Sequence, residues 1–70
     1  MRSALDLKRV AAAGGGLIID ASKYSTLDLK TIASGAKADI ILKNTAGISA
    51  MDLKSIAAVG NGHVVFDMTS

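Results

Sequence analysis

The chain alternates between two hydrophobic patterns. Three segments that follow Ser3, Ser25 and Ser49 place apolar side chains three and four residues apart, the spacing that puts them on one face of an α-helix. Each segment is followed by a short run of consecutive apolar residues, which is typical of a strand in a parallel sheet. With the charged residue that ends each run, the expected strands are residues 17–20, 40–43 and 64–67. The sequence therefore predicts three helices alternating with three strands.

A repeated motif, Ser-x-[Leu/Met]-Asp-Leu-Lys, opens each expected helix at Ser3, Ser25 and Ser49. A serine at this position can accept a hydrogen bond from the backbone N–H three residues on, and an acidic residue there favours the positive end of the helix dipole. Glycine or small residues then predict the helix ends, where glycine is expected to supply a left-handed cap. The motif is thus expected to start helices and not to carry chemistry.

Each helix is expected to turn one apolar stripe toward the sheet. The stripes are Leu7, Val10 and Ala11; Leu29, Ile32 and Ala33; and Leu53, Ile56 and Ala57. A further apolar residue in each motif lies roughly 160° around the helix from the stripe, at 100° per residue. These residues, Leu5, Leu27 and Met51, are expected to pack between neighbouring helices.

Helix–strand alternation favours parallel strands joined by helical crossovers of one hand. The expected fold class is α/β, with three helix–strand units in the order αβαβαβ. We expect a short parallel sheet in sequential order with the helices on one face. The units form a single domain of residues 1–70 and span about residues 3–24, 25–48 and 49–70.

Repeats of roughly 22 and 24 residues, each a helix plus a strand, resemble the leucine-rich-repeat class of α/β solenoid. The segment from Ile40 to Asn44 has the strand and the asparagine of that class but lacks its spaced leucines. The resemblance implies sequential parallel strands with helices on one side. It carries over no functional residue.

Composition shows how little this fold can bury alone. The chain has 70 residues, half of them apolar, with one Phe, one Tyr and no Trp or Cys. An aliphatic core in so short a chain is near the lower limit for folding without disulfides, metal or oligomerisation. We therefore expect a homo-oligomer, with a symmetric dimer favoured. The exposed edges of the sheet offer a second surface for another copy.

Charge and hydropathy exclude several partners. The net charge of +2 comes from eight basic and six acidic residues scattered along the chain, which is a poor match to nucleic acid. No run approaches the ~20 apolar residues of a membrane span, so no membrane is expected. The start, Met1-Arg2-Ser3, has no apolar signal segment, and the absence of cysteine fits a cytoplasmic location.

Strand alternation predicts a second sheet face, turned away from the helices. Its apolar strip is Ile18, Ile41 and Val65. On one side of the strip lies a cross-strand row of acid, base and acid, formed by Asp20, Lys43 and Asp67. On the other side lie Asp39 and His63. This face is either a solvated charge ladder beside a small apolar strip or an interface that buries the strip against a second copy.

Residues capable of catalysis are few. His63 is the only histidine, and with Asp39 it supplies only two good metal ligands. We therefore predict no catalytic residue, metal or cofactor, and expect the chain not to be an enzyme. Two functions stay open. One is a structural module that binds a second copy of itself and can also display the charged sheet face to a protein or peptide partner. The other is a ligand or enzymatic site formed across an oligomer at the strand carboxyl ends, from Asp20, Lys43, Asp67 and His63.

Overall fold

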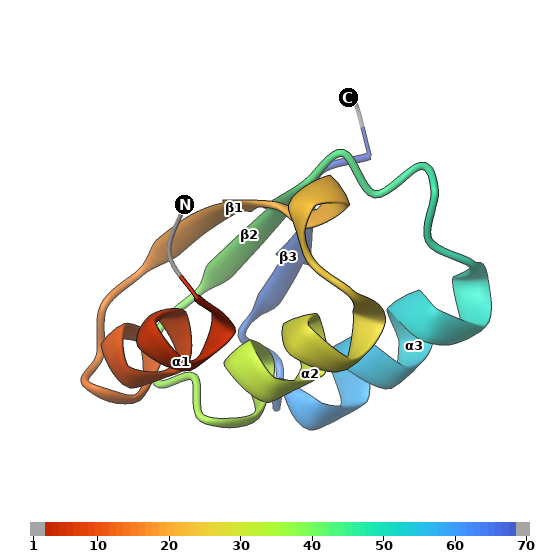
Figure 1. Cartoon of the computed structure of the whole chain (residues 1–70). Helices are drawn as coiled ribbons and strands as arrows, with labels where there is room; N and C mark the ends of the chain where they lie inside the picture. The colour runs from red at the N-terminus through yellow and green to blue at the C-terminus, as the bar shows by residue number, and fades with distance from the viewer. Residues whose placement is uncertain (1–2, 69–70) are drawn as a thin grey trace.

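The computed structural model describes residues 3–68, so the four terminal residues of the expected domain lie outside the described residues. Three helices alternate with three strands along this range (Figure 1). The helices are α1 (Ala4–Ala12), α2 (Thr26–Ser34) and α3 (Ala50–Val59). The strands are β1 (Leu17–Asp20), β2 (Ile40–Lys43) and β3 (Val64–Phe66), and a 3₁₀ turn, η1 (Ala21–Lys23), follows β1. The α/β fold class is confirmed.

The strands form one parallel sheet in the order β1-β2-β3. The register pairs Leu17 with Ile40 and Ile40 with Val64. All three helices lie side by side against the same face of this sheet (Figure 1). The molecule therefore has a helical layer and a sheet layer, with the core between them.

The helix starts follow the predicted capping chemistry. The side chains of Ser3, Ser25 and Ser49 accept hydrogen bonds from backbone N–H groups three residues on, at 3.1–3.2 Å. The donors are Asp6, Asp28 and Asp52. Each motif thus satisfies a backbone donor that a helix start otherwise leaves unpaired.

The helix ends differ in part from the prediction of left-handed glycines. Gly14 after α1 has a φ of 98°, as expected, but Gly35 and Gly60 cap α2 and α3 with negative φ. After α3 the left-handed residues are Asn61 and Gly62. Gly60 is needed for space instead, because a Cβ there would overlap the Cγ2 atom of Val64.

The core is aliphatic and centres on the middle helix and strand. Its buried members are Ala11, Ile19, Ala21, Leu29, Ile32, Ala33, Ile40, Leu42 and Ile56. The predicted stripe is buried in full only in α2, because Val10 of α1 and Ala57 of α3 are exposed. The prediction for Leu5, Leu27 and Met51 is wrong: all three are more than half exposed, so none of them is enclosed between neighbouring helices.

Candidate interface on the open sheet face

The sheet face opposite the helices carries an exposed apolar strip. The register aligns Ile18 with Ile41 and Ile41 with Val65 across the three strands. Ile18 is 70% exposed and Val65 43% exposed, whereas Ile41 on the central strand is partly buried. No element of the described chain covers this strip (Figure 1). All-parallel sheets are almost always covered on both faces, so the bare face is unusual.

The predicted charged row lies at one end of the strip. The register pairs Asp20 with Lys43, and the Asp67 N–H donates to the Leu42 carbonyl at 2.8 Å, which continues the ladder beside Lys43. The structure therefore brings Asp20, Lys43 and Asp67 together at one end of the sheet, where the three strands finish. Lys43 is exposed and both acids are partly exposed.

Asp20 has a local partner that the sequence reasoning missed. Its Oδ1 accepts from the Ser22 hydroxyl at 2.6 Å and from the Ser22 N–H at 3.0 Å. The carboxylate thereby starts the η1 turn that leads from β1 toward α2. An aspartate two residues before a serine is a known turn signal, so the spacing itself could have predicted this contact.

The same hydrogen bonds predict how acid weakens the fold. The Ser22 hydroxyl, and after it the Asn44 side chain, hold the pKa of Asp20 below its ordinary value. Because the pKa is lowered in the folded state, Asp20 stabilises the fold at pH values above about 3.9, and this contribution is lost as the pH falls through the folded pKa. We therefore expect the unfolding free energy of Asp20→Asn to fall less steeply than that of the wild type as the pH drops below about 4.

Urea unfolding at a series of pH values measures this effect. Ser22→Ala is the matched variant, since it removes the main hydrogen-bond donor and keeps the carboxylate. Its unfolding free energy should also fall less steeply than that of the wild type at acid pH. If both variants lose unfolding free energy at acid pH as steeply as the wild type, this role for Asp20 is contradicted.

His63 lies at the opposite end of the sheet from the charged row. It directly precedes β3, and its Nδ1 is 3.5 Å from Oδ1 of Asp39, as the predicted strand pairing implies. Four residues of extended chain separate it from Asp67, or about 13 Å at ~3.3 Å per residue. His63 therefore cannot act on the same small group as Asp20, Lys43 and Asp67. Among residues 3–68, no group of three or more His, Cys, Asp or Glu side chains could hold a metal ion.

Two clefts flank the sheet. The first, of about 340 Å³, lies at the strand carboxyl ends beside the amino ends of α2 and α3, and is lined by hydroxyl and amide groups together with Asp52. The Asp52 carboxylate accepts from the Thr26 hydroxyl at 3.4 Å, so it occupies a position where an anion would otherwise bind.

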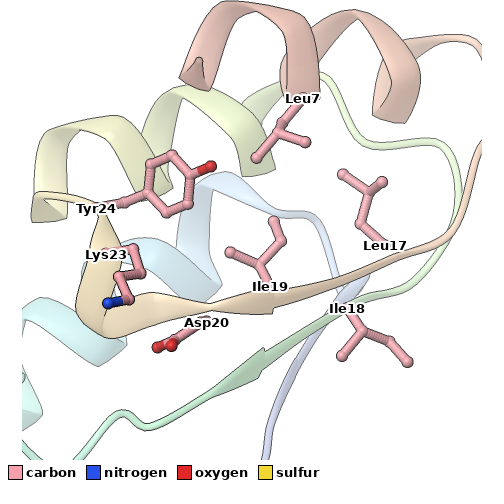
Figure 2. A pocket seen from close by; sticks show the side chains of 7 residues that line it. All are labelled: Leu7, Leu17, Ile18, Ile19, Asp20, Lys23 and Tyr24. Carbon is pink, nitrogen blue, oxygen red and sulfur yellow. The ribbon is translucent and has the colours of Figure 1, made fainter. Parts of the chain in front are cut away.

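The second cleft, of about 190 Å³, opens at the free edge of β1 and is mainly apolar. Figure 2 shows Leu7 of α1 above it, Leu17 and Ile19 turned toward the helices, and the Tyr24 ring beside them. Ile18 and Asp20 point to the other side of the strand (Figure 2). The sequence predicted an unprotected edge here, but the cleft depends on the space left between α1 and β1 and has no sequence signal of its own.

These features define an α/β protein with one covered and one bare sheet face. No helix within residues 3–68 has the length and apolar character needed to span a membrane. Comparison with protein-family models, with curated proteins and with solved structures finds no match to this chain.

Proposed function

We propose that this protein is a small self-associating interaction module, built from three α/β repeats of the leucine-rich-repeat-like solenoid type, and that the bare sheet face is its homodimer interface. The observation that carries the proposal is the exposed strip of Ile18, Ile41 and Val65 on an all-parallel sheet. Burial of this strip against a second copy would remove apolar surface from water, the main favourable contribution to association. The shortage of large core residues supports the same conclusion.

The charged row restricts how two such faces can meet. Two rows superposed directly would place Lys43 opposite Lys43 of the second copy, which is unfavourable. An offset of one strand places Lys43 opposite Asp20 or Asp67 of the other copy. The charges thus favour a small number of alignments, and Lys43→Ala is expected to weaken the dimer less than a change in the apolar strip.

The test places a charge in the strip. Ile18→Asp should weaken dimerisation by at least about tenfold, because a carboxylate would have to be desolvated without a partner in the interface. Leu27→Asp is the matched control, since Leu27 is equally exposed but lies on the helical layer. Analytical ultracentrifugation measures the mass, and circular dichroism checks that each variant is folded.

The result that supports the proposal is a wild-type protein that dimerises, the same mass for Leu27→Asp, and a mass closer to the monomer for Ile18→Asp at the same protein concentration. Equal masses for the two folded variants would contradict the sheet-face interface. Ile41→Asp provides a second variant on the central strand, where Ile41 belongs to the same strip.

The cleft at the strand carboxyl ends favours one alternative, a small-ligand site completed by an oligomer. Open α/β sheets commonly bind ligands in this position. Such a site would use the hydroxyl-lined cleft together with Asp20, Lys43 and Asp67, and without His63, which lies at the other end of the sheet. A Lys43→Ala variant that keeps its oligomer but loses a ligand would favour this function. The absence of cysteine supports a cytoplasmic location for either function.

A further inference from the structure

Equivalent positions in the three helices differ sharply in burial. Val10, Ile32 and Ile56 occupy the same place after their capping serines, yet Val10 is 47% exposed while Ile32 and Ile56 are 1% and 0% exposed. The difference follows the order of the helices in the stack. This position faces the preceding helix–strand pair, and Val10 has none before it in the described chain.

The next position shows the opposite order. Ala11 and Ala33 are buried, whereas Ala57 at the equivalent place in α3 is exposed. This position therefore faces the following helix–strand pair, and within the described chain α3 has no successor. This burial pattern fits packing between successive helices in which a branched residue of the later helix meets the alanine position of the earlier one.

The two edge strands, β1 and β3, are also less completely covered than the central strand. On β2 the helix-facing residues Ile40 and Leu42 are buried, but their equivalents on β3, Val64 and Phe66, are only partly buried. At the other end the cleft beside β1 leaves Leu17 partly uncovered (Figure 2). Within residues 3–68, each edge strand also presents a row of backbone groups without a neighbouring strand.

The backbone ladder repeats in a way that a second copy could continue. The Leu17 N–H donates to the Asp39 carbonyl at 3.2 Å, and the Ile40 N–H donates to the His63 carbonyl at 2.7 Å. In both cases a strand donates to the residue that precedes the next strand. By the same rule the Val64 N–H would donate to the Gly16 carbonyl of another copy.

We propose that two copies of this chain dock head to tail, with the β3 end of one against the β1 end of the other. The contact would place Ala57 against Val10, Val64 beside Leu17 and Phe66 beside Ile19, reproducing between molecules the contact seen twice within the chain. It is heterologous, so it builds rings or linear stacks. It uses different residues from the sheet-face dimer and does not rest on it.

One charge pair opposes this contact. The continued register brings Asp67 of one copy beside Asp20 of the next, and like charges on adjacent strands are destabilising. The end-to-end contact is therefore weaker than the unit-to-unit contact within the chain. Asp67→Asn should tighten it roughly 1.5- to 5-fold.

Two end-blocked variants test the direction of docking. Val10→Glu blocks only the β1 end and Ala57→Glu only the β3 end, and both change exposed helical positions to a good helix former. The Ile41→Asp change is added to both, which removes the sheet-face contact. We expect each double variant alone to be a monomer, because one of its two ends is blocked. An equal mixture of the two should form a heterodimer through the two unblocked ends. The Ile41→Asp single variant should associate further as its concentration rises. A mixture that stays monomeric, or Ile41→Asp protein that stays monomeric, would overturn the proposal.

A disulfide trap tests the same contact in the wild-type background and does not depend on Ile41→Asp folding. The chain has no cysteine, so Val10→Cys and Ala57→Cys each supply a single thiol. Mild oxidation of the mixture should give mainly the Val10→Cys/Ala57→Cys heterodimer. Leu27→Cys, on the exposed helical surface, is the control for random collision. Cross-linking of the pair no greater than that of either variant with Leu27→Cys would also overturn the proposal.

Discussion

Ile32→Ala should lower the free energy of unfolding by about 2–5 kcal/mol, the usual cost of removing a fully buried aliphatic side chain. Ile32 is 1% exposed, and it belongs to α2, which lies between α1 and α3 against the sheet (Figure 1). A domain of 70 residues has a total stability of roughly 4–10 kcal/mol. The variant should therefore lose a large fraction of the stability of the wild-type protein.

Val10→Ala is the matched control, because Val10 occupies the equivalent position in α1 but is exposed. It should cost less than about 1 kcal/mol in the monomer, since little apolar area is lost. Urea unfolding at low protein concentration, followed by circular dichroism, compares the two. Similar losses for Ile32→Ala and Val10→Ala would contradict the difference in packing between the middle and the first helix.

Gly60→Ala should destabilise the protein by about 1–3 kcal/mol, the usual cost of forcing a methyl group into a packed site. Gly60 is buried, and a Cβ there would overlap Cγ2 of Val64 at the start of β3. To relieve the overlap, the end of α3 or the first residue of β3 must move. The strand would then lose part of its pairing with β2.

Gly47→Ala is the control for this substitution. Gly47 is exposed, and a Cβ added there meets no atom within 4 Å. Its unfolding free energy should stay within about 0.5 kcal/mol of wild type, as for most surface substitutions. If the thermal or urea midpoint of Gly60→Ala is as close to wild type as that of Gly47→Ala, the turn after α3 has room for a side chain and the prediction is wrong.

Much of the fold could be predicted because local signals and hydrophobic periods agree. The first two strands have the predicted bounds, the third ends one residue early at Phe66, and every helix begins directly after its predicted serine cap. Strand alternation also placed Ile18, Ile41 and Val65 on one face and aligned Asp20 with Lys43. These features depend on residue order within a single element or on pairing of equivalent strands.

The remaining features depend on what surrounds each element. A periodic pattern cannot show that Val10 is exposed while Ile32 is buried, since the difference arises from the neighbour that each helix has. The clefts depend on loop conformations, including a left-handed Asn44 after β2, that the residue types alone do not set. Leu27 was misplaced for a similar reason, because helical angle fixes its direction but not the position of the next helix.

Solution mass at micromolar concentration tests the proposed self-association most directly. Sedimentation equilibrium should give a species of at least twice the 7.1 kDa chain mass, with a return toward the monomer in Ile18→Asp. A wild-type protein that is folded and remains at 7.1 kDa across the micromolar range would contradict the proposed function.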